Sequence, residues 1–184
     1  LSITDGIPMP RVFIVNDPYE GASHLPDLWM AVPHFCGDTL AAFSLMYTHH
    51  VDIGGRFPSG QSGQCTETYE EGLRIPLVKL VDAGKLNKTL MAVVLANVRG
   101  SDEYQGDVEG KLTGCWRATQ GMNRVFEKYG LENFNACFDR VHEYTKAAAL
   151  AAIAKMPRGE YKAELTLPDN GFGEQDPNLV MRVT

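Results

Sequence analysis

Hydrophobic and polar residues are arranged differently in the two halves of the chain. Residues 11–16 are rich in β-branched and aromatic side chains, which predicts a strand, and Asn16-Asp17-Pro18 ends it with turn-forming residues. Two longer apolar stretches follow at 28–35 and 39–48. Only Cys36-Gly37-Asp38 separates them, so we interpret them as the two arms of an antiparallel hairpin.

After residue 85 the hydrophobic spacing changes to that of helices. Residues 85–98 repeat apolar side chains with helical periodicity. Residues 102–129 and 131–155 predict two long helices separated at Gly130. The turn-forming Pro157-Arg158-Gly159 ends the second of them. This half of the chain is therefore expected to be mainly helical.

The complete pattern predicts an α+β fold with a mainly antiparallel sheet, a central hairpin and two long helices. We expect a single domain over residues 1–184, because this length supports one hydrophobic core. It would be strand-rich over 1–80, helical over 85–156 and strand-forming again over 160–184, with strands at 160–167 and from 178. The missing initiator Met and the final strand suggest a fragment of a larger fold.

Composition narrows the classes of function. A net charge of −6 argues against a nucleic-acid-binding protein and against an electrostatic membrane anchor. No apolar run reaches the roughly 20 residues that a membrane-spanning helix needs. The four cysteines are widely spaced and contain no CxxC pair, which favours neither a zinc ribbon nor a disulfide framework. A reducing, cytoplasmic location is therefore expected.

Metal-binding residue types lie at both ends of the predicted hairpin. His24 and Asp27 precede its first arm, and His49-His50 ends its second arm. Antiparallel pairing brings these two ends together, so one hairpin is enough to assemble a cluster. Two imidazoles and one carboxylate suit Zn, Mn or Fe and leave positions open for water or substrate. We expect a divalent metal here, although packed, metal-free histidines are the alternative.

Strand parity leaves two versions of this cluster. Side chains alternate along a strand, so His49 and His50 cannot both face the same site. Parity allows either His24, Asp27 and His49, or His24, Asp27 and His50 with Asp52 supporting the site from behind.

Other polar residues are weaker candidates. An Asp within Asn16-Asp17-Pro18 is more often a turn former than a ligand, so we favour a structural role for Asp17. Glu67, Glu71 and Arg74 could contact a substrate, but a salt bridge among them is the commoner outcome. The loop at 54–64, rich in Gly, Ser and Pro, is expected beside the site.

Several strings along residues 11–162 occur together and in order. They are FIVNDPYEGASHLPD at 13–27, HHVDIGG at 49–55, TETYEEGLRIP at 66–76, VKL at 78–80, LANVR at 95–99, GD at 106–107 and YG at 129–130. Together they closely resemble the hydantoinase B/oxoprolinase family. Two differences stand out: family members are much longer, and residues 110–120 depart from their pattern.

The resemblance implies a function and a set of ligands. The family includes subunits of ATP-dependent hydantoinases and lactamases, a section of 5-oxoprolinase, and subunits of acetone and acetophenone carboxylases. Its metal pattern carries over onto His24, Asp27 and His49, with His50 as the fallback, and a further acidic ligand lies upstream in some members. A hydantoinase A-type partner would use ATP to activate the substrate, since this chain has no nucleotide-binding string.

We therefore expect a metal-bearing catalytic subunit of a cytoplasmic hetero-oligomer. Its reaction would be ATP-dependent hydrolysis of a cyclic amide such as a hydantoin, a lactam or 5-oxoproline. ATP-dependent carboxylation of a ketone is the alternative reaction. A non-catalytic assembly module, with the long helices as its interface, is the alternative of another class.

Overall fold

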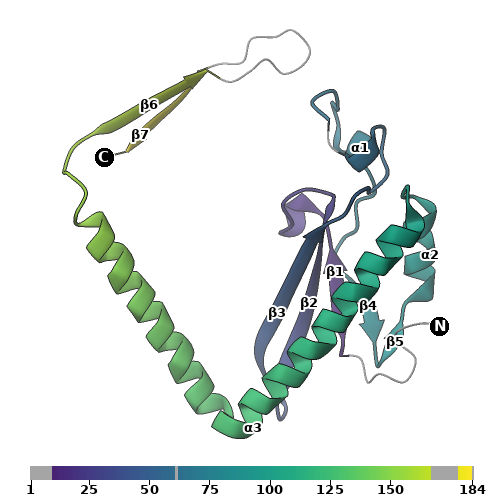
Figure 1. Ribbon diagram of the computed structural model, residues 1–184, viewed down its shortest axis with the longest axis horizontal. Helices are drawn as coiled ribbons and strands as arrows, with labels where there is room; N and C mark the ends of the chain where they lie inside the picture. Colours follow the sequence, from purple (N-terminus) through teal and green to yellow (C-terminus); the bar gives the residue numbers. More distant parts are fainter. Residues whose placement is uncertain (1–9, 61, 167–177, 184) are drawn as a thin grey trace. The chain divides into compact units, whose positions relative to one another are not determined.

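The fold was obtained as a computed structural model that describes residues 10–60, 62–166 and 178–183. Backbone contacts divide the chain into two compact units, Leu1–Leu131 and Glu132–Thr184. The boundary falls inside the longest helix (Figure 1), so each unit is described by itself. The expectation of one domain over 1–184 stays a prediction.

The first unit is built on a five-stranded antiparallel sheet. The strands are β1 (Val12–Val15), β2 (Asp27–Cys36), β3 (Thr39–His49), β4 (Val78–Asp82) and β5 (Lys85–Leu86). Their spatial order is β3-β2-β1-β4-β5, and every neighbouring pair is antiparallel. Both the predicted hairpin and the predicted sheet type are therefore confirmed.

The hairpin turn is tight, and a bulge follows it. Gly37 has a φ of 60°, a conformation that glycine adopts without steric cost, and Cys36 pairs directly with Thr39. The register then shifts by one residue between His34 and Phe35, where Ala41 has no partner on β2. Beyond this bulge every pair along the hairpin is displaced by one position. The shift extends to the far end, where the candidate ligands lie.

The helices agree with the sequence in number but not in all bounds. α2 spans Lys88–Ala96 and α3 spans Ser101–Ile153, with a non-helical Gly130 (φ 71°, ψ 167°) at the predicted break. The prediction of helix from residue 85 was wrong: Lys85–Leu86 is β5, and the Asn87 side chain caps the helix by accepting from the Leu90 N–H. Three short helices complete the unit: η1 (Pro18–Glu20), η2 (Pro58–Gly60) and α1 (Thr68–Glu71).

The core lies between one face of the sheet and the helices α2 and α3. Figure 1 shows α2 and the first part of α3 beside the sheet. Even-numbered residues of β2, such as Leu28 and Met30, are buried in the same cluster as Tyr104 and Leu112 of α3. On the opposite face Trp29 stacks on Tyr47, with ring centroids 4.4 Å apart. Odd positions of β2 and β3 therefore face away from the helices.

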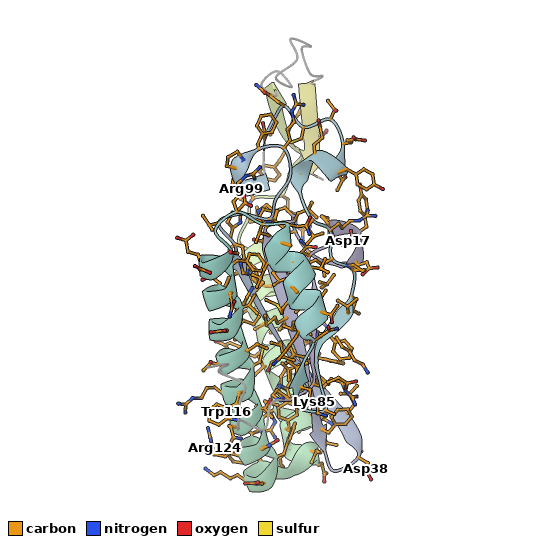
Figure 2. The ribbon with its side chains drawn as sticks, turned by 90° about the vertical axis from the view of Figure 1, so that its right-hand side faces the viewer. Asp17, Asp38, Lys85, Arg99, Trp116 and Arg124 are labelled. Carbon is orange, nitrogen blue, oxygen red and sulfur yellow. The ribbon has the colours of Figure 1, made fainter. Side chains whose placement is uncertain are left out.

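The two ends of the first unit differ in character. Figure 2 shows Asp38, in the hairpin turn, at one end, and Asp17 and Arg99 near the other end. The latter end carries the loops that follow β1, β3 and α2. These connecting segments, rather than regular elements, surround the candidate ligands.

The second unit pairs two strands after the end of α3. β6 (Tyr161–Thr166) and β7 (Asn178–Val183) are antiparallel, with Tyr161 opposite Val183. Both predicted strands are confirmed, although Leu167 lies outside the described residues. Within the described part of the chain, no helix combines the length and apolarity needed to cross a membrane.

Gly55 makes a testable contribution to this fold. Its φ is 81°, and an added Cβ would lie 2.5 Å from the Glu70 carbonyl oxygen. Gly55→Ala therefore combines backbone strain with a clash, and we expect the free energy of unfolding to fall by roughly 2–5 kcal/mol in urea titrations. Gly84→Ala is the matched control, because φ is 76° there and no described atom lies within 4 Å of the added Cβ. Equal losses in the two variants would contradict the packing argument.

Candidate metal centre

The hairpin and the turn before it bring three ligand-type side chains together. Asp27 lies directly opposite His49 in the β2–β3 ladder, and the His50 N–H extends that ladder by donating to the Pro26 carbonyl at 2.9 Å. His24 joins them through a turn in which the Asp27 N–H donates to the His24 carbonyl at 3.0 Å. The convergence expected from hairpin geometry is thus present.

The Asp27 carboxylate lies between the two imidazoles. Its Oδ1 is 3.1 Å from His49 Nδ1, and its Oδ2 is 3.0 Å from His24 Nδ1. The two rings are tilted, with centroids 4.9 Å apart. The Asp27 side chain is only 9% exposed, whereas those of His24 and His49 are 32% and 51% exposed. The cluster therefore has a buried carboxylate and a side open to solvent.

The donors fit a divalent metal. His24 Nδ1 is buried and lacks the angular geometry of a hydrogen bond to Asp27, so its lone pair is uncommitted. The candidate ligand atoms of His24, Asp27 and His49 all lie within 4.8 Å of one another. Two ligands of one zinc ion, each about 2.1 Å from the metal, lie at most roughly 4.2 Å apart, so a small contraction would complete the site. The N₂O donor set suits Zn, Mn or Fe.

The bulge in the hairpin selects His49 over His50. Had the register at the Cys36–Thr39 turn continued, Thr48 rather than His49 would oppose Asp27, and His50 would share its face. The one-residue shift at Ala41 places His49 there instead. His50 is fully buried on the helix side and is not part of the cluster, so the alternative set with His50 is not the one the fold brings together.

His50 instead contacts α3. The Lys111 ammonium donates to His50 Nε2 at 2.6 Å and to the Leu28 carbonyl at 3.1 Å. Burial, reinforced by the positive charge of Lys111 and by His49, lowers the pKa of His50 to about 3, so the ring is neutral at pH 7. Burial also lowers the pKa of Lys111 to about 8, although the Asp107 carboxylate opposes this. The sequence did not indicate Lys111, because a lysine on a predicted helix is normally solvated.

Asp52 organises the loop after the cluster rather than supporting His50. Its carboxylate accepts from the N–H groups of Gly54 (2.8 Å), Ser59 (3.1 Å) and Arg99 (2.8 Å), and from the Arg99 guanidinium (3.0 Å). Burial raises the pKa of Asp52, but these hydrogen bonds outweigh burial and hold it below its ordinary value. Arg99 was quoted only within a string, and its partner 47 residues away could not be read from local sequence.

The weaker candidates have mostly structural roles. Asp17 caps η1 by accepting from the Tyr19 N–H at 3.0 Å, and it also pairs with Arg74 at 3.4 Å. Its expected structural role is therefore confirmed, and Arg74 pairs with Asp17 rather than with Glu67 or Glu71.

Two clefts adjoin the cluster. One of about 480 Å³ is lined by His24, Ser62, Gly63 and Glu71, so the loop that begins at Gly54 does lie beside the site. The other, of about 390 Å³, runs between β3 and α3 and reaches His49; its lining includes Thr48, Asp107 and Lys111. A small molecule could therefore approach the open side of the cluster.

Comparisons with known proteins place the chain. The family model for hydantoinase B/oxoprolinase matches residues 10–184. The B-type polypeptide of a putative D-/L-hydantoinase from Pseudomonas sp. (strain NS671) is 34% identical over 168 residues, which cover 90% of this chain and 28% of that protein. The chain thus spans under a third of the length of this relative.

Solved structures agree with this placement. The crystal structure of ATP-dependent caprolactamase from Pseudomonas jessenii superposes with a TM-score of 0.85 at 27% identity, over 98% of this chain and 31% of that one. A nucleotide-free acetone carboxylase structure shares the fold, with a TM-score of 0.72 at 23% identity over 85% of this chain and 21% of that one. The chain belongs to the hydantoinase B/oxoprolinase family.

Proposed function

We propose that this chain carries the metal centre of an ATP-dependent enzyme that hydrolyses a cyclic amide, with His24, Asp27 and His49 as its catalytic ligands. The observation that carries the proposal is the convergence of these side chains, with an uncommitted nitrogen on His24 and an open side. The names of the relatives, a putative hydantoinase and an ATP-dependent caprolactamase, support a hydantoin, a lactam or 5-oxoproline as substrate.

The chain's own residues would hold and orient the reacting groups. The two imidazoles present neutral nitrogen donors, and Asp27 contributes a negative charge from its buried position. A divalent metal bound there would act as a Lewis acid on a carbonyl or phosphoryl oxygen. The exposed edges of His24 and His49 leave room for a substrate that enters from the adjoining cleft.

We further propose that ATP is used by a hydantoinase A-type partner, so that the working enzyme is a cytoplasmic hetero-oligomer. The relatives are named as subunits, which supports a partner of some kind. Ketone carboxylation is the second candidate reaction, favoured by the fold shared with acetone carboxylase. The third outcome is an assembly module with metal-free histidines.

Two measurements on the intact natural protein and its co-purifying partners test the proposal. Elemental analysis should find about one Zn, Mn or Fe per chain, and a metal-free, fully folded protein would favour the assembly module. The complex is then incubated with ATP and, separately, a hydantoin, a lactam, 5-oxoproline, or a ketone plus bicarbonate. Ring-opened acids would support hydrolysis, whereas a β-keto acid from the ketone would replace it with carboxylation.

A further inference from the structure

We infer that Lys111 is a positioning residue for the metal centre, which holds both ligand-bearing strands from the opposite face of the sheet. The inference rests on the proposed metal centre. It assigns a role to a side chain that lies 61 residues from its imidazole partner in sequence and on a different element.

Lys111 is bonded to the residues next to two of the three ligands. Its ammonium donates to the Leu28 carbonyl, one residue after Asp27, and to the ring of His50, one residue after His49. Side chains alternate along each strand, so these neighbours face the helix while the ligands face the other side. One cation therefore fixes the two strand ends at the level where Asp27 pairs with His49.

Burial makes this attachment stringent. Lys111 is only 4% exposed, so the ammonium is largely without water and depends on protein acceptors. If the end of β3 moved relative to β2, one of its two hydrogen bonds would be lost, and a buried charge would be left under-satisfied. The lysine thus resists the sliding and fraying that would separate His49 from Asp27.

The same contact fixes the state of the His50 ring. Because Nε2 accepts from Lys111, the ring proton is assigned to Nδ1, which lies 3.7 Å from the Asp107 carboxylate. The ring also packs against Tyr104, with centroids 4.1 Å apart. His50 is held on three sides, and the backbone that it shares with His49 is held with it.

Two effects of the Lys111 charge on metal binding oppose each other. Its positive charge repels a divalent ion, so removing it would tighten binding. Solvent reaches His24 and His49 and screens that repulsion, whereas the hydrogen bonds to Leu28 and His50 are short and buried. Positioning should therefore dominate, and loss of Lys111 should weaken metal binding.

The test is metal affinity in the intact natural protein, measured by competition with a chromophoric chelator for Zn²⁺, together with the visible absorption of the Co²⁺-loaded form. Lys111→Met should weaken Zn²⁺ binding by about 10- to 100-fold and should alter the Co²⁺ bands, as loss of a residue that supports metal ligands commonly does. Lys128→Met, an exposed lysine on the same helix, should change neither.

A control for simple destabilisation is the neighbouring core residue Leu112. Leu112→Ala should lower stability but leave the Zn²⁺ affinity and the Co²⁺ bands of the folded protein unchanged. If Lys111→Met does not fold, Lys111→Arg serves instead: it keeps the charge but not the fit, and it should also weaken binding. Wild-type affinity and bands in the folded Lys111 variant would overturn the inference. Absence of metal binding by the wild-type protein would instead overturn the proposed function on which it rests.

Discussion

Replacing His24 with alanine is expected to abolish metal binding and turnover while the fold persists. His24 supplies the uncommitted buried nitrogen of the cluster, and its ring is one-third exposed, so its loss removes a donor without opening the core. With only Asp27 and His49 remaining, two protein ligands would have to hold the ion, which is fewer than the three typical of catalytic sites. Bound metal measured by elemental analysis should fall below about a tenth of the wild-type content.

The matched control is His142→Ala, which removes an exposed imidazole from the part of α3 that lies in the second unit. It should retain full metal content. Circular dichroism of both variants should match the wild type, because neither ring belongs to the hydrophobic core. An active, metal-replete His24→Ala protein would refute the proposed centre.

Asp52→Ala is expected to lower the free energy of unfolding by about 3–5 kcal/mol, the cost typical of removing one partner from a buried charged network. The Asp52 carboxylate receives four hydrogen bonds from three segments of chain, and the residue is 4% exposed. Without it, the amides of Gly54, Ser59 and Arg99 lose their shared acceptor. Urea titration monitored by circular dichroism measures the loss.

Asp82→Ala provides the comparison. Asp82 also pairs with two cations, Arg11 and Lys79, but it is about half exposed, so its loss should cost less than about 1 kcal/mol. Acid titration gives a second check. Because the pKa of folded Asp52 lies below its ordinary value of 3.8, its contribution is present above that pH and is lost as the pH falls below it. The stability of Asp52→Ala should therefore fall less steeply below about pH 4 than that of the wild type.

Local sequence patterns determined much of this protein. Alternating residues and the glycine-containing turn at 36–38 were enough to predict the hairpin, and the helical period with Gly130 predicted the two parts of α3. The spacing of His24 and Asp27 before one arm and of His49 after the other predicted the cluster itself. These features depend on backbone periodicity and turn chemistry, which are properties of short stretches of chain.

Tertiary structure decided the rest. Whether His49 or His50 faces Asp27 depends on a single unpaired residue in the ladder, Ala41, because a one-residue shift exchanges the two faces of a strand. The burial of Lys111 against His50 depends on how α3 packs on the sheet, and that contact joins residues 61 positions apart. Contacts at this distance follow from the packing of whole elements, so no local pattern in the chain could indicate them.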